Sequence, residues 1–365
     1  SARRSPGCPA YHMVEDREAI QSGKRIAARH YATGEAIDGG RIFYNFMRPV
    51  TEKGQMALEL ERARLLDYDM VKTYVRLRHD TQKDVVDAAH RMGMHLSSHY
   101  HYPALHSGMD GMEHIGATNR YGYSRTVTSL GGGYGDVNDL FAAAKAGRTP
   151  TLFSATALLG IDDGLAHDPR ITALYPPWEY AKLLARAKAM KGDGGKPLLA
   201  SLDRQVDQIK AMLAAGWHPL SGTDAPIDLT AISLHLNLRG MVRCGVSPHD
   251  ALMMTTRGSG EFMDEPIGRI EPGMLADLIL IEGDPLGDVT AVANVKQVVA
   301  NGVVHSPEQL IAPFASAKPQ AALTPVMPAP ELALAHAHQH YWWHDADYVE
   351  SSRAACCAGH AVAHA

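Results

Sequence analysis

MVKTYVRLRHDTQKDVVDAAHRMGMHLSSHYHY, residues 70–102, decides the fold class of this chain. It begins with a β-like run at 70–77 and continues through an amphipathic helical stretch at 81–93. A second β-like run at 95–102 ends it. A strand, a helix and a second strand in this order are typical of neighbouring parallel strands, because a parallel pair needs a long crossover between its members.

The same unit recurs along most of the chain. Further β-like runs bounded by Gly or Pro lie at 25–33, 111–116, 149–155 and 217–224. The longest helical stretch between them spans 203–217 and carries apolar residues on one face, Val206, Ile209, Met212 and Leu213. Repeated β–α units predict an α/β fold with a parallel sheet, either open or closed into a barrel.

Composition narrows the function classes. Of 365 residues, 45% are hydrophobic and 21% charged, which is typical of a globular protein with a large core. The net charge of −5 and the absence of a long basic run argue against nucleic-acid binding. No window is apolar for the roughly 18 residues of a membrane span. The first twelve residues lack the apolar core of a signal peptide, and both an exported and a cytoplasmic location stay open.

The pattern divides the chain into four parts. Residues 1–262 hold the β–α units, and 263–305 change to short strands and turns that predict a small β unit. Residues 306–335 are rich in Pro and Ala and are typical of a linker. Residues 336–365 are rich in His and aromatic residues, and we expect an arm that packs on a partner rather than a metal-binding tail.

Four residues that could carry chemistry lie at the ends of different predicted strands: Lys72, His99, His114 and Asp224. Each alone has an ordinary explanation, such as a hydrogen-bonded structural histidine or an aspartate that caps a turn. A lysine inside a buried strand is costly unless it is paired or chemically changed. Together, two imidazoles, a carboxylate and a modified lysine would make a site for one or two divalent metals of the zinc class.

The order of several motifs resembles the amidohydrolase superfamily, in particular its imidazolonepropionase and Xaa-Pro-dipeptidase-like branch, which includes enzymes fused to a β-propeller. The motifs are Lys72, SHYHYP at 98–103, GMDGMEHIG at 108–116, SGTDAP at 221–226 and IGRIEPGMLADLILIEGDPL at 267–286. The last is highly specific for that superfamily. The likeness covers about residues 15–305.

This resemblance implies a (β/α)8 TIM-type barrel with a small β-sandwich and a metal-dependent hydrolase activity. The bond cleaved would be a C–N bond in an amide, an N-acyl amino acid, a dipeptide or a cyclic amide. Lys72 would be the carboxylated lysine that bridges the metals, most readily Zn²⁺, and His99 and His114 would be ligands. Asp224 would be both ligand and general base for a metal-activated hydroxide.

Substrate contacts are assigned from strand alternation. Tyr74 and Arg76 fall on the same side as Lys72, and we hypothesise that one or both bind a substrate carboxylate; a structural arginine is the equal alternative. His101 shares a side with His99, so either could be the metal ligand. The SHxxYP match favours His99 and leaves His101 for substrate contact or for lining the pocket.

One departure from the superfamily stands out. Its first strand carries an HxH pair of metal ligands, and no HxH precedes Lys72, while HAHQH at 336–340 lies far downstream. We therefore expect a barrel incomplete at its N-terminal strand, with 4–12 as the remains of the second strand and 25–33 as the third. The preferred explanation for the missing HxH pair is a separate N-terminal polypeptide that carries this strand. A truncated chain and a non-catalytic assembly subunit rank below it, and a homo-oligomer is compatible with each.

Overall fold

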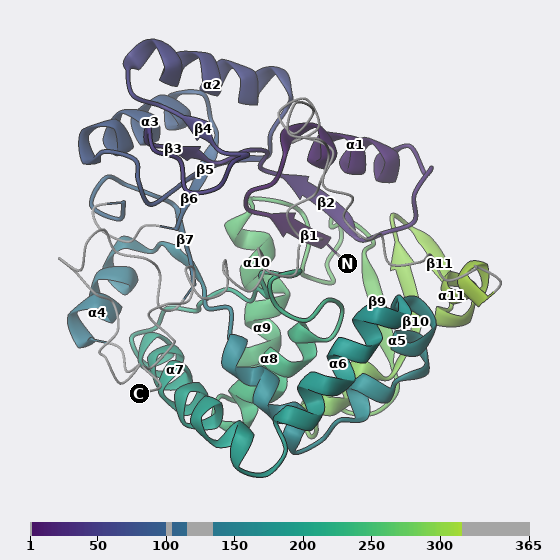
Figure 1. The fold of residues 1–365 in the computed structure, drawn as a ribbon. Coiled ribbons are helices and arrows are strands. Elements are labelled where there is room, and N and C mark those ends of the chain that lie inside the picture. Colours follow the sequence, from purple (N-terminus) through teal and green to yellow (C-terminus); the bar gives the residue numbers. More distant parts are fainter. Residues whose placement is uncertain (1, 100–103, 115–133, 316–365) are drawn as a thin grey trace, which may run out of the picture.

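The computed structural model describes residues 2–99, 104–114 and 134–315 of the chain (Figure 1). These residues form an α/β fold with a six-stranded parallel sheet, a two-stranded parallel sheet and a three-stranded antiparallel sheet. The predicted α/β class with a parallel sheet is confirmed. None of the helices in the described ranges is long and apolar enough to cross a membrane.

The strands are β1 (Ala2–Ser5), β2 (Arg29–Ala32), β3 (Ile37–Asp38), β4 (Arg48–Pro49), β5 (Met70–Thr73), β6 (His95–Ser98), β7 (Gly111–Glu113), β8 (Gly147–Thr149), β9 (Leu278–Ile281), β10 (Val295–Ala300) and β11 (Val303–His305).

The α-helices are α1 (Ala10–Gln21), α2 (Lys53–Leu65), α3 (His79–Arg91), α4 (Gly135–Ala144), α5 (Pro169–Leu174), α6 (Pro177–Ala189), α7 (Lys196–Ala214), α8 (Ser233–Arg243), α9 (Pro248–Thr255), α10 (Arg257–Phe262) and α11 (Pro307–Ala315). The 3₁₀ helices are η2 (Phe153–Gly160), η3 (Gly164–His167), η4 (Gly192–Gly195) and η5 (Val289–Ala293).

The β5–α3–β6 unit is the predicted strand–helix–strand at residues 70–102. β5 and β6 pair in parallel with Lys72 opposite Ser97, and every residue of β5 is buried. Helix α3 buries Val85, Val86 and Ala89 in the core that it shares with the sheet. It begins two residues earlier than the predicted start at residue 81. The apolar stripe of the helix thus packs on the apolar strands of the sheet, and the two form adjacent layers.

The six-stranded sheet runs in the order β4-β3-β5-β6-β7-β8, and α2, α3, α4 and α7 lie outside its strands (Figure 1). A hydrogen bond of 2.8 Å from the Asp69 amide to the Ala32 carbonyl connects the start of β5 to β2. At the β8 edge of the sheet, the Leu220 amide donates to the Arg148 carbonyl at 2.6 Å. The predicted strand at 217–224 is therefore anchored beside β8, although it forms no regular strand.

One sequence expectation is wrong in the middle of the chain. The run at 149–155 is a strand only at its first residue, and η2 begins at Phe153. The stretch 154–202 that follows is largely helical. The reason is burial: Leu158 and Leu159 of η2 join an apolar core with α6, α7 and α8. Val206 and Ile209, predicted on the buried face of the helix at 203–217, belong to the same core.

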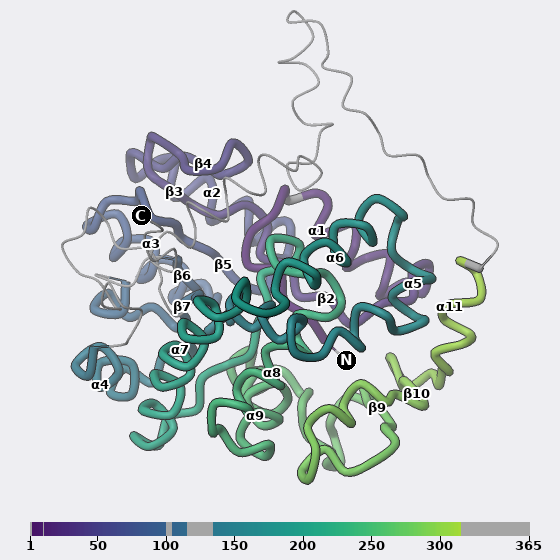
Figure 2. The backbone as a smooth tube through the Cα atoms, turned by 60° about the horizontal axis from the view of Figure 1, so that its bottom comes forward, coloured from purple at the N-terminus to yellow at the C-terminus, as the bar shows by residue number. Residues whose placement is uncertain are grey.

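The small β unit predicted in residues 263–305 is present as the antiparallel sheet β9–β10–β11. About half of the surface of Ile279, Leu280 and Val303 on this sheet is exposed. Helix α11 follows β11, packs against α5 and β10, and occupies the start of the segment expected to be a linker (Figure 2). The expected arm at 336–365 lies outside the described residues.

Candidate active site

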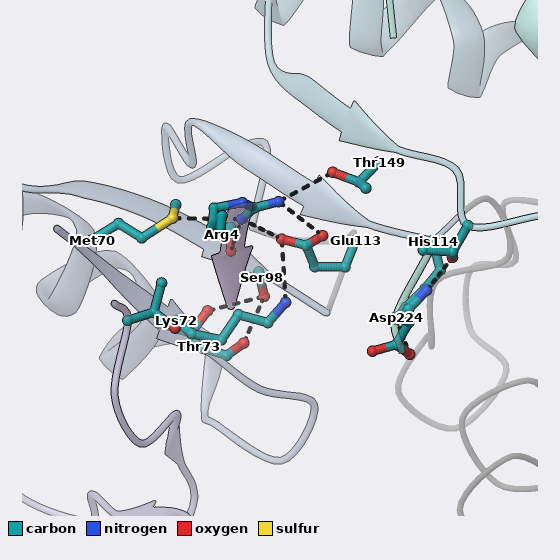
Figure 3. Close-up of polar contacts among 12 residues, drawn as sticks. Arg4, Met70, Lys72, Thr73, Ser98, Glu113, His114, Thr149 and Asp224 are labelled. Atoms are coloured by element: carbon teal, nitrogen blue, oxygen red, sulfur yellow. Dashed lines mark hydrogen bonds and ion pairs between the residues drawn. The ribbon is translucent and has the colours of Figure 1, made fainter. Parts of the chain in front are cut away.

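Three of the predicted site residues meet at one end of the parallel sheet. His99 directly follows β6, His114 directly follows β7, and Asp224 follows the segment whose Leu220 amide bonds the Arg148 carbonyl of β8. The ring centroids of His99 and His114 are 4.5 Å apart, and both side chains are buried. His114 Nε2 lies 3.5 Å from Asp224 Oδ2 (Figure 3). Neighbouring parallel strands have their carboxyl ends at the same edge of a sheet, so the residues that directly follow them lie close together.

A residue that the sequence did not single out orients His114. The Thr151 hydroxyl forms a hydrogen bond with His114 Nδ1, and the ring of Phe153 stacks over the imidazole with centroids 5.9 Å apart. The His114 amide donates to the Thr149 carbonyl at 2.7 Å, so the residue is also held by its backbone. Thr151 lay within a predicted strand, and no local pattern marks it as a partner of a residue 37 positions away.

Lys72 is paired in this structure. Its side chain is only 2% exposed, and its Nζ lies 3.5 Å from Glu113 Oε1 (Figure 3). The alternation of β5 directs Lys72 to the side of the sheet from which β7 presents Glu113. A buried ammonium is tolerated when a carboxylate compensates its charge, which is one of the two explanations that the sequence left open.

Sequence reasoning did not assign two further residues, the buried Glu113 and the partly buried Arg4. Arg4 extends from β1 and donates through Nη1 and Nη2 to the two carboxylate oxygens of Glu113, at 2.7 and 3.1 Å. Nη2 also donates to Thr149 Oγ1 at 3.2 Å, and Nη1 to Ser97 Oγ at 3.4 Å. One guanidinium therefore connects β1 to β6, β7 and β8 (Figure 3).

The charges around Glu113 keep it ionised. Burial raises the pKa of a carboxyl group, but here the charges of Arg4 and Lys72 outweigh burial. Together they hold the pKa of Glu113 well below its ordinary value of 4.5. The only sequence signal for this role is an acidic residue in the apolar run GMEHIG.

The predicted substrate residues lie in different surroundings. The Tyr74 ring packs against His99, with centroids 4.7 Å apart, so it borders the site. Arg76 lies with its guanidinium 4.8 Å from the Phe43 ring and donates to the Arg41 carbonyl at 3.3 Å. It therefore holds the loop between β3 and β4. His101 lies outside the described residues.

Asp38 fixes the same loop from the side of the sheet. Its fully buried carboxylate accepts hydrogen bonds from the Phe43 amide at 2.8 Å and from the Arg76 amide at 2.7 Å. Burial raises the pKa of Asp38, and the backbone N–H groups that it accepts from oppose that rise only in part. The loop that carries Phe43 is thus pinned next to the strand end that carries Tyr74.

The donor types at this site suit a zinc-class ion, because imidazole nitrogen and carboxylate oxygen are its usual ligands besides thiolate. Within 2–99, 104–114 and 134–315, however, no group of three or more His, Cys, Asp or Glu side chains is arranged to hold a metal. The described side chains therefore fit such an ion in donor type but are not arranged to hold one by themselves.

Comparison with known proteins agrees with the fold. A solved Xaa-Pro dipeptidase with methionine bound in its active site is similar at 20% identity, with a TM-score of 0.58 over 83% of this chain and 74% of that one. A bottromycin amidohydrolase has a TM-score of 0.63 at 19% identity, covering 87% of this chain and 75% of its own. A putative prolidase from Bifidobacterium longum has a TM-score of 0.58 at 18% identity, covering 86% and 75%.

No curated protein sequence matches the chain significantly. The sequence profile of the amidohydrolase family does match, over residues 75–304. That range contains His99, His114 and Asp224 together with the closing motif at 267–286. The resemblance inferred from the motifs is therefore confirmed, and the chain belongs to the amidohydrolase family.

Proposed function

We propose that this chain is the larger part of a metal-dependent hydrolase that cleaves a C–N bond in an amide, an N-acyl amino acid, a dipeptide or a cyclic amide. The observation that carries the proposal is the approach of His114 Nε2 to Asp224 Oδ2 at 3.5 Å, next to the buried ring of His99. Family membership supplies the reaction class, and this cluster supplies the residues for it.

Asp224 is the proposed general base. Its carboxylate takes a proton from the attacking water and later delivers it to the leaving nitrogen, which balances the hydrolysis. About a quarter of its side chain is exposed, whereas His114 is almost fully buried, so Asp224 is the partner that water reaches. A divalent ion bound by these residues would acidify the water and polarise the carbonyl of the scissile bond.

The proposed ligands are Lys72, His99, His114 and Asp224, with Zn²⁺ as the ion and one or two ions per site. Carboxylation of Lys72 would replace its positive charge with a negative one beside Glu113. Arg4 would continue to balance Glu113, because it binds both carboxylate oxygens independently of Lys72. Tyr74, Arg76 and His101 are the proposed substrate contacts.

The proposed architecture is a TIM-type barrel over residues 1–262, incomplete at its N-terminal strand, with 263–305 as part of a composite β-sandwich. The half-exposed apolar residues Ile279, Leu280 and Val303 support a further layer over that sheet. A separate polypeptide carrying an HxH segment would supply this layer and the missing donors. The arm predicted at 336–365 would serve contacts with this polypeptide or with a second copy of the chain.

The test combines composition with activity on natively purified protein. Native and denatured masses with metal analysis should reveal a second polypeptide and about one or two zinc-class ions per pair. The same sample is then offered N-acetylated amino acids, Xaa-Pro dipeptides and a cyclic amide, with release of the amine measured. A lone chain that binds no zinc and hydrolyses none of them would contradict the catalytic proposal and favour the assembly subunit.

A further inference from the structure

Three neighbouring residues of the site share an unusual backbone. His114, Thr151 and Asp224 have left-handed φ angles of 67°, 46° and 55°. Glycine and, less often, asparagine or aspartate adopt this region easily, whereas a β-branched threonine does so at a clear cost. A threonine held in this conformation at the end of a strand suggests that its side chain is needed at that place.

The two branches of Thr151 reach the two segments that form the site. Its hydroxyl bonds His114 Nδ1, and its methyl group faces Gly222, two residues before Asp224. A Cβ built on Gly222 would lie 3.8 Å from Thr151 Cγ2 and 2.2 Å from Thr149 Cγ2. Because Gly222 has no side chain, the segment that leads to Asp224 can lie close to Thr149. The buried Thr151 lies between this segment and His114.

The hydroxyl decides whether Nε2 or the ring carbon Cε1 of His114 faces Asp224. A half-turn of an imidazole about its Cβ–Cγ bond exchanges Nδ1 with Cδ2 and Nε2 with Cε1, so a flipped ring would present a carbon to each partner. With Nδ1 held by Thr151 and the ring stacked on Phe153, Nε2 is the atom that points to Asp224 Oδ2. A bond to one ring nitrogen is the usual way in which a protein fixes the role of the other.

We propose that Thr151 is a positioning residue that fixes the imidazole of His114 with Nε2 toward Asp224. The inference deepens the proposed function and rests on it for the catalytic meaning of that orientation. The geometric part stands on the described contacts alone, so the two parts can be tested separately.

The first experiment reads the histidine ring directly. The full chain is labelled with ¹⁵N-histidine, and the His114 signals in a long-range ¹H–¹⁵N spectrum are assigned with His114→Gln. Wild type and Thr151→Ser should show a hydrogen-bonded Nδ1, and Thr151→Val should lose that signature. Thr156→Val is the matched control, because Thr156 is also buried and its hydroxyl has no hydrogen-bond partner within the described ranges. It should match wild type.

A second variant separates positioning from stability. Thr151→Gly removes the hydroxyl but accepts a left-handed φ without strain, so it should stay folded and still lose the His114 signature. It also replaces Thr151→Val if the valine variant does not fold. An unchanged His114 spectrum in a folded Thr151→Gly or Thr151→Val protein overturns the inference.

The activity experiment uses whichever amide the wild type hydrolyses. Thr151→Val should lower kcat by about 10- to 100-fold with little change in KM, the usual effect of removing a residue that orients a metal or catalytic ligand. Thr151→Ser should retain most of the wild-type kcat. A wild type that hydrolyses no amide contradicts the proposed function and leaves the spectroscopic result standing. An active enzyme whose kcat is unaffected by Thr151→Val removes the catalytic meaning of the orientation.

Discussion

The guanidinium of Arg4 spans the carboxylate of Glu113, with Nη1–Oε1 and Nη2–Oε2 distances of 2.7 and 3.1 Å, although 109 positions separate the two residues. The first strand of the described chain is thereby fixed to β7, the strand that His114 directly follows. Lys72, the proposed carboxylated lysine, approaches the same carboxylate. The N-terminal segment thus shares one buried group with the candidate site.

Replacing Arg4 with glutamine should destabilise the protein markedly. Arg4→Gln removes a bidentate partner from a carboxylate that is 4% exposed, and the loss should be about 3 kcal/mol because a buried charge loses its main compensation. Urea denaturation measures it. Arg64→Gln is the matched control, since Arg64 forms a bidentate pair with Glu61 on the surface and its loss should change little. Equal effects of the two changes would show that burial does not matter here.

His30 should make stability depend on pH in mildly acidic solution. Burial first, and then Arg3 and Arg17, lower the pKa of His30 from 6.5 to about 4. Between these pH values the unfolded chain binds more protons at this residue than the folded chain, so the free energy of unfolding falls as pH falls through that window. Above pH 6.5 the residue contributes no pH dependence.

His30→Asn should therefore flatten the stability profile between pH 6.5 and 4, measured by urea denaturation at a series of pH values. His249→Asn is the control, because the ring of His249 is mostly exposed in the folded chain. A profile in which both variants keep the slope of the wild type would remove His30 as its source.

Asp224→Asn should abolish most of the proposed hydrolysis. An amide cannot accept the proton of the attacking water, and loss of a general base lowers kcat by about a hundred- to ten-thousand-fold. The rate of amine release measures the effect. Asp264→Asn is a close control, because Asp264 also has a left-handed φ and is exposed far from the site in sequence. Full activity in Asp224→Asn would exclude the aspartate as the base.

Arg76→Ala should reduce hydrolysis of carboxylate-bearing substrates relative to their amides, as expected if Arg76 recognises a substrate carboxylate. The ratio of kcat/KM for an N-acyl amino acid and its amide is the measurement. Arg76 also supports the loop that carries Phe43, so an equal loss on both substrates would assign it to that loop instead.

Local sequence patterns and motifs were enough to predict the layers of this fold and three residues of the candidate site. Strand and helix periods are properties of short segments, so β5, α3 and β6 could be located from the sequence. Because parallel strands end at one edge of a sheet, the residues after β6 and β7 could be expected to meet, as His99 and His114 do. Asp224 was found through its motif.

The tertiary structure alone decided the rest. Arg4 and Thr151 carry no local signal, and Glu113 carries only that of an acidic residue in an apolar run, because their roles depend on side chains 37 to 145 positions away. The segment after β8 folded as η2 rather than as a strand because burial against α6, α7 and α8 overrode its β-like composition. Periodicity is a property of residues within one helical turn or one strand pleat. The pairing of a buried charge and the orientation of an imidazole depend instead on which distant segments the packed sheet brings together.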